Sequence, residues 1–158
     1  MRLKHCCLEF ASEEDKNNRD FVLGAVNENG MNLEFAPDHF KDDEEIVLAA
    51  IQNDAHAILH ASTNLKKNRK IAMAVVIRDG ECLRFLLRRF KEDPEIVMEA
   101  CCHGEFIITY ASRDIKKKKK TFFTPEFYEL KKERKIEQER IQKEFEDKFF
   151  KLTTFKDG

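Results

Sequence analysis

Tryptophan is absent from this 158-residue chain, and only 3 prolines, 5 glycines and 2 tyrosines are present. The glycines are scattered, so the chain lacks the glycine-rich loop with which many proteins bind phosphate groups. No apolar run approaches the roughly 20 residues that a membrane-spanning helix needs. The first residues also lack the apolar core of a signal peptide. We therefore expect no transmembrane segment and a cytoplasmic location.

Disulfide bonds are not indicated either. The 5 cysteines are an odd number and show no framework spacing, which favours a reducing compartment. Charged residues make up 37% of the chain, a share typical of short helices with solvated outer faces. Residues 1–112 carry 14 basic against 20 acidic side chains, whereas residues 113–158 carry 15 against 10. A charged partner for the basic C-terminal part is one reading, and contact with the acidic part is another.

What the sequence has in abundance is repetition, and the motif that opens at Asn18 returns in register at Asp43, Asn68 and Asp93. Apolar residues recur at two positions of this unit. Phe21, Ile46, Ile71 and Ile96 occupy the first position, and Leu33, Ile58, Leu83 and Ile108 occupy the second. Such self-similarity is typical of stacked repeats, in which each unit buries its apolar face against its neighbours. We therefore predict that these eight residues form the core.

The clearest unit begins at Asp43, a good helix N-cap, and continues with an apolar stripe of helical spacing. The spacing predicts a helix of about three turns that ends at a turn tolerating a left-handed residue, such as Asn29-Gly30. A second, shorter helix follows, at 31–36, 56–61 and 81–86, and then a turn. The predicted fold is all-α, a solenoid-like array of 25-residue helix–turn–helix repeats followed by one long helix.

The predicted boundaries follow from this register. The array occupies 1–117, with a partial unit at 5–17 and complete units from 18, 43, 68 and 93. A basic linker spans 118–123, a long charged helix 124–152 and a tail 153–158. The helix opens with Thr124-Pro125-Glu126, which combines an N-cap, a proline at the first position and an acidic residue. Its interrupted apolar stripe permits either docking on the array or self-association.

The unit resembles a known repeat. It reads Asp-x-Glu-Ile-Val-x-x-Ala, then a glycine turn, then Leu-x-Phe/Tyr-Ala-Ser, as at Asp43–Ala50, Gly30–Ala36 and Ile108–Ser112. It is similar to an uncharacterised family of short tandem helical repeats, of unknown function, found in intracellular bacteria, protists and large viruses. The resemblance covers about residues 5–117 and departs from the pattern at His60, Leu87 and Lys118. It implies a binding module or scaffold without assigned catalytic residues, and an origin in an organism that manipulates a host, with delivery into the host cytosol.

Histidines and cysteines supply two candidate sets of metal ligands. The triplets His5-Cys6-Cys7 and Cys101-Cys102-His103 lie almost four units apart, and Cys101 aligns with core residues. His56 and His60 stand four residues apart, a spacing that chelates zinc only with a third ligand, for which Asp54 and His39 are the obvious choices. Packing or partial exposure is the favoured reading of both histidines. We expect no cofactor and no metal.

Nucleophile, phosphate-loop and paired-carboxylate signatures are missing, so we expect no enzyme. The strongest local feature is basic. It comprises Arg84, Arg88, Arg89, Arg113, Lys116, Lys117, Lys118, Lys119 and Lys120. Arg88 and Arg113 hold equivalent positions of successive units and are expected side by side. The first functional hypothesis is a scaffold or adaptor that binds another protein. The alternative is weak electrostatic binding of nucleic acid or an anionic membrane through this strip, and the plainest reading is ordinary surface charge.

Overall fold

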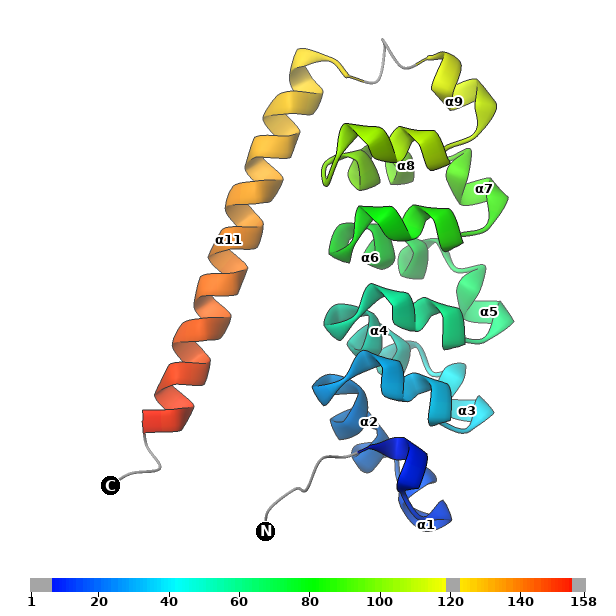
Figure 1. Cartoon of the computed structure of the whole chain (residues 1–158), viewed down its shortest axis with the longest axis vertical. Coiled ribbons are helices and arrows are strands. Elements are labelled where there is room, and N and C mark those ends of the chain that lie inside the picture. The colour runs from blue at the N-terminus through cyan, green and yellow to red at the C-terminus, as the bar shows by residue number, and fades with distance from the viewer. Residues whose placement is uncertain (1–6, 119–122, 155–158) are drawn as a thin grey trace. The chain divides into compact units, whose positions relative to one another are not determined.

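The computed structural model describes residues 7–118 and 123–154. These residues are helical, without strands, and chain contacts divide the protein into two compact units, 1–117 and 118–158. Figure 1 shows the long helices of the first unit stacked in order of sequence. They are α2 (Arg19–Glu28), α4 (Glu44–Asn53), α6 (Arg69–Arg78) and α8 (Pro94–Cys101). The predicted all-α repeat array is therefore confirmed.

Each complete repeat contains three helical segments, one more than predicted. The long helix is followed by a 3-10 helix and then by a single turn of α-helix. The 3-10 helices are η1 (Leu8–Phe10), η2 (Gly30–Phe35), η3 (Ala55–His60), η4 (Gly80–Phe85) and η5 (Glu105–Tyr110). The short α-helices are α1 (Glu13–Lys16), α3 (Asp38–Lys41), α5 (Thr63–Lys66), α7 (Arg88–Lys91) and α9 (Arg113–Lys117).

Side-chain caps explain where these helices begin. Asp43 and Asp93 each accept backbone N–H bonds from the first turns of α4 and α8, and Asn18 and Asn68 do the same for α2 and α6. Serine starts some of the short helices in the same way, since Ser62 accepts from the N–H of Leu65. Such caps satisfy backbone donors that have no partner inside the helix. The short α-helix was missed because a single turn carries too few residues for a periodic pattern.

The turn after each long helix differs from the prediction, because no described residue there has a left-handed backbone. Asn29, at the end of α2, has an extended backbone (φ −149°), and its side chain accepts from the N–H of Met31 to cap η2. Gly30 is needed for space: a Cβ there would overlap the carbonyl oxygen of Ala50 in the next repeat. The absence of a side chain at Gly30 thus allows two successive repeats to approach closely.

The core lies between successive long helices and the 3-10 helices beside them. The predicted positions Ile46, Ile71, Ile96, Leu33, Ile58, Leu83 and Ile108 are all buried. Phe21 departs from the prediction, because it is half-buried and its neighbour Val22 is fully buried instead. Among the described residues only η1 and α1 precede α2, so no earlier long helix covers Phe21.

A ladder of polar side chains closes the C-terminal ends of the long helices. Asn53 donates to the carbonyl oxygen of Asn27 at 2.9 Å, and Arg78 donates to that of Gln52 at 2.8 Å. His103, in the next repeat, lies 3.0 Å from the carbonyl of Ile77. The last carbonyls of a helix lack partners within it, so each repeat supplies partners to the helix before it. Glu28 holds this position in α2, and no long helix precedes α2 among the described residues.

The second unit consists of α11 (Pro125–Thr154), which extends slightly beyond the predicted limit at residue 152. Its expected N-cap is present, since Thr124 Oγ1 accepts from the N–H of Phe127 at 3.4 Å. A hydrogen bond with Thr124 also lowers the pKa of Glu126 below its usual value. The side chains at 138, 141, 142 and 144–158 lie outside the described residues, so self-association through this helix stays a prediction. Within the described residues no helix is both long enough and apolar enough to cross a membrane.

Candidate functional site

The short α-helices form one edge of the array, and their sequences show both a constant and a changing feature. A lysine occupies the same place in each of them: Lys16, Lys41, Lys66, Lys91 and Lys116. The first helical residue changes along the array from acidic to neutral to basic. It is Glu13, Asp38, Thr63, Arg88 and Arg113 in turn. Positive charge therefore concentrates at α7 and α9.

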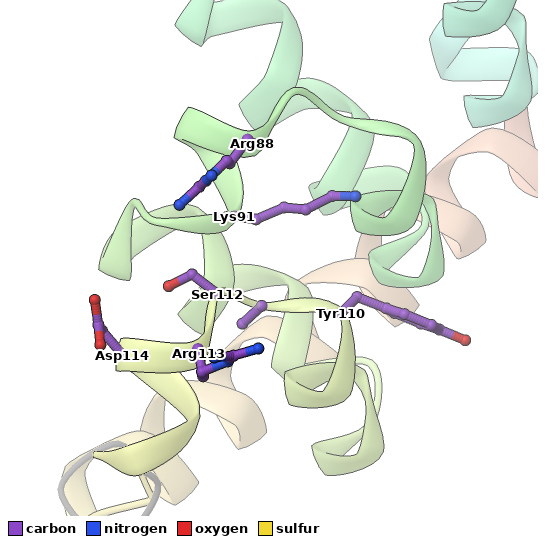
Figure 2. Close-up of a pocket in the computed structure, with 7 residues that line it drawn as sticks. Arg88, Lys91, Tyr110, Ser112, Arg113 and Asp114 are labelled. Carbon is purple, nitrogen blue, oxygen red and sulfur yellow. The ribbon is translucent and has the colours of Figure 1, made fainter.

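Between α7 and α9 the surface is hollowed by about 550 Å³, and we call this region the basic hollow. Its lining consists of Arg88, Lys91, Tyr110, Ala111, Ser112, Arg113 and Asp114. Figure 2 shows Arg88 and Lys91 on α7 at one side and Ser112, Arg113 and Asp114 at the other. Arg88 and Arg113, which were expected side by side, thus line opposite sides of one hollow. A hydrogen bond from the Ser112 N–H to the Lys91 carbonyl, at 2.8 Å, joins the two sides.

The charges in the basic hollow are unequally compensated. Arg88 pairs with Glu92 one turn later at 2.8 Å, which, with a smaller contribution from Asp114, raises the pKa of Arg88 above its usual value. Lys91 extends away from Arg88 and donates to the Arg84 carbonyl at 2.6 Å. Arg113 is exposed and has no ion pair among the residues that the structure describes. Three cations and one carboxylate thus line a surface that is suited to an anion.

The remaining residues of the predicted strip are not gathered here. Arg84 lies over the ring of Phe85 at 4.5 Å, and Arg89 lies over the ring of Phe90 at 4.7 Å while donating to the Lys67 carbonyl. Lys116 and Lys117 are exposed at the end of α9, and Lys118 follows them. Lys119 and Lys120 lie outside the described residues.

Sequence reasoning missed five lining residues: Lys91, Tyr110, Ala111, Ser112 and Asp114. The recurring lysine was a visible signal for Lys91, because it returns once in every repeat on the edge that carries Arg88. No comparable signal pointed to Tyr110, which lies at the end of η5 and comes to α7 only through stacking of the repeats.

A second surface runs along the outer sides of the long helices. The same position holds Leu23, Leu48, Met73 and Met98, all half-buried, and we call these residues the apolar ladder. The next position is small in the first three repeats, with Gly24, Ala49 and Ala74. A hollow of about 590 Å³ opens over Leu23 and Leu48 and is bordered by Glu44, Glu45 and Lys70. Partly exposed apolar side chains with a polar border are typical of protein-binding surfaces.

Contacts between neighbouring repeats alternate along the array. Arg19 pairs with Asp43 at 3.3 Å and with Glu45 at 2.5 Å, and two repeats later Arg69 makes the same contacts with Asp93 and Glu95. The N–H of Ser62 donates to the Lys41 carbonyl, just as Ser112 does to Lys91. At the intervening junction Lys70 instead reaches back to Glu44, at 2.5 Å. The repeats therefore come in pairs, and the pair is the true structural period.

A comparison with known protein families finds three matches, of which two coincide with these pairs and one, 1–41, overlaps the first pair and is out of step with it. A protein family described as a domain of unknown function, DUF4116, matches residues 1–41, 18–66 and 68–116. The last two matches lie end to end, and each contains one pair of repeats. No curated protein and no solved structure matches the chain. Because the family matches most of the chain as tandem copies, this protein belongs to the DUF4116 family.

Proposed function

We propose that the chain is a non-enzymatic scaffold that binds another protein through the apolar ladder. The observation that carries the proposal is the recurrence of Leu23, Leu48, Met73 and Met98, all half-buried, at one position of four successive repeats. Each of these side chains retains surface that a partner could cover, and burial of apolar surface drives most protein association. Methionine adapts to partners of varied shape because its side chain is unbranched and flexible.

The charged residues at the border of the apolar ladder restrict which partner binds and in which orientation. Glu44, Glu45 and Lys70 edge the hollow over Leu23 and Leu48, and these charges are already paired with Arg19 or with each other. Rim charges of this kind govern the choice and orientation of a partner more than affinity. The partner we infer is therefore a protein segment with apolar side chains at its centre and polar ones at its edges.

Location and biological role belong to the same proposal. We place the protein in the cytoplasm, or in a host cytosol if it is delivered there as an effector. The free thiols of Cys7, Cys82, Cys101 and Cys102 support a reducing compartment. An adaptor and a regulator of one particular enzyme would both bind their partner through the apolar ladder.

The test is a tagged pull-down from nuclease-treated lysate at low and high salt, with the partners identified by mass spectrometry. We expect one stoichiometric protein to survive high salt and to be lost with the variant Leu48→Glu/Met73→Glu. The control variant Leu59→Glu introduces one glutamate at an apolar side chain on η3 that is 44% exposed, away from the apolar ladder. Equal capture by parent, double variant and control would overturn the role of the apolar ladder.

A second candidate function is binding of a polyanion, and the basic hollow is the observation that favours it. The test variant is Arg88→Thr/Arg113→Thr, and the control is Lys132→Ala/Lys135→Ala, which also removes two positive charges. Threonine fits the first position of the short helices, as Thr63 shows. Binding of a labelled single-stranded oligonucleotide or of phosphatidylserine vesicles should weaken steeply with salt. The first variant should lose binding and the second should keep it; equal loss in both would indicate charge without a site.

A further inference from the structure

We propose that His56, Asp79 and Cys82 form a zinc-binding site at the junction of the second and third complete repeats. The three side chains come from η3, from the end of α6 and from η4. A His ring nitrogen, an Asp carboxylate oxygen and the Cys sulfur all lie within 4.8 Å of one another. Imidazole, thiolate and carboxylate are the three ligand types that proteins use for zinc.

The separation is close to what zinc requires. Tetrahedral ligands at about 2.0–2.3 Å from the ion stand roughly 3.5 Å apart, so closing the triad takes a movement of about 1 Å. Three protein ligands leave a fourth position for water or for a group from a partner.

Asp79 has an oxygen to spare for this role. Its Oδ1 accepts from the N–H of Glu81 at 2.9 Å, which caps η4, while its Oδ2 accepts from the thiol of Cys82, with Sγ 3.7 Å away. The capping function therefore occupies one oxygen, and the other faces the thiol. Metal binding and helix capping are compatible in the same side chain.

His56 is held by a second carboxylate. Asp54 Oδ1 lies 3.0 Å from Nδ1 of His56, and the ring of Phe85 packs edge-on at 5.6 Å. A histidine that donates Nδ1–H to a carboxylate carries its lone pair on Nε2 and has a fixed ring orientation. This outer partner is typical of metal-binding histidines.

The charge around the Cys82 sulfur is mainly negative. The carboxylates of Asp79 and Asp54 act on it, against the single positive charge of Arg84. Carboxylates beside a candidate ligand attract a divalent cation.

The repeat shows that the fold does not require these residues. At the preceding junction the equivalent places are held by Met31, Asp54 and Ala57, and at the following one by Glu81, Gly104 and Ile107. Of these three junctions, the middle one alone brings together a histidine, a carboxylate and a cysteine. It is also the junction between the family matches at 18–66 and 68–116, where the Arg–Asp pairs of the other junctions are replaced by Lys70–Glu44.

The test uses the full chain, reduced and freed of metal, titrated with Co²⁺ and then with Zn²⁺. We expect one Co²⁺ per chain, a thiolate-to-cobalt charge-transfer band in the near ultraviolet, loss of the band on adding Zn²⁺, and a higher Tm with either ion. Cys82→Ala and His56→Met copy the residues of the preceding junction, so both variants should fold, as circular dichroism would verify. Each should lose the band and the rise in Tm.

A control variant separates this site from the thiols of Cys6, Cys7 and Cys102. Cys6→Ser/Cys7→Ser/Cys102→Ser leaves the proposed ligands in place and should keep the cobalt band. No band and no change in Tm for the parent protein would overturn the proposal. So would a band that persists in Cys82→Ala or disappears in the control variant. These readouts are independent of whether the apolar ladder binds a partner.

Discussion

The guanidinium of Arg69 in α6 forms an ion pair with Asp93, the N-cap of α8, with Nε and Oδ2 3.0 Å apart. Arg19 makes the same pair with Asp43 two repeats earlier. In both cases a cap that starts one long helix also binds the side chain of the helix before it. This double use links local helix initiation to the stacking of repeats, and it recurs once in each of the family matches at 18–66 and 68–116.

Because the N-caps Asp43 and Asp93 are ion-paired carboxylates, we expect the protein to lose stability in acid. Burial alone would raise the pKa of Asp93, but hydrogen bonds from Arg69 and from the Ile96 N–H hold it below the usual value. Against the same effect of burial, the pKa of Asp43 is lowered by the Ile46 N–H and Arg19. A carboxyl group whose pKa is lower in the folded than in the unfolded state stabilises the protein at any pH above its unfolded-state pKa of about 3.9. This stability is lost as the pH falls from that value through the folded-state pKa.

The measurement is urea unfolding as a function of pH, for the parent and for Asp43→Asn/Asp93→Asn. Asn18 and Asn68 already cap α2 and α6, so asparagine should preserve the caps while removing the ion pairs. The variant should show a smaller fall in unfolding free energy between about pH 5 and 2. Identical pH profiles would mean that the pairs do not contribute to acid sensitivity.

Asn53 should matter more than its neighbour Gln52, although both side chains are exposed. Its Oδ1 accepts from the N–H of Gly30 at 2.8 Å, and its Nδ2 donates to the Asn27 carbonyl. Asn53→Ala removes both and leaves the N–H of a buried glycine without this acceptor, at a cost of about 1–3 kcal/mol. Gln52→Ala should change stability by less than about 0.5 kcal/mol. Equal values from chemical denaturation would contradict the ladder of polar side chains.

Two glycines should respond in opposite directions to alanine. A Cβ at Gly80 would overlap the Ala100 carbonyl oxygen, so Gly80→Ala should destabilise by about 1–3 kcal/mol through overpacking. Gly24 lies in α2 with no atom within 4 Å of the added methyl group. Gly24→Ala should therefore stabilise by about 0.5–1 kcal/mol through helix propensity. Thermal unfolding monitored by circular dichroism measures both, and a stabilised Gly80→Ala would disprove the close approach.

The register itself is tested by Ile71→Asp. Ile71 is fully buried in α6, so an unpaired charge there should cost on the order of 3 kcal/mol or more. Leu59→Asp places the same charge on a side chain that is 44% exposed and should change stability by less than about 0.5 kcal/mol. A variant Ile71→Asp that melts like the parent would place this residue outside the core.

The sequence by itself determined the architecture. A constant repeat spacing, helix caps at Asn18, Asp43, Asn68 and Asp93, and recurring apolar residues were sufficient for an all-α array, because these signals are local and recur in every complete repeat. The register also placed Arg88 and Arg113 next to each other, since equivalent positions of stacked repeats are neighbours.

Only the tertiary structure decided which residues meet across junctions. The sequence pattern offered His56 the partners His60 and Asp54 on its own segment; the structure keeps Asp54 beside it and adds Asp79 and Cys82 of the next repeat. Tyr110 reaches the edge of the basic hollow in the same way. The pairing of repeats depends on side-chain reach across a junction, as between Arg69 and Asp93. Such contacts arise from distances between repeats, and a pattern within one repeat contains no information about those distances.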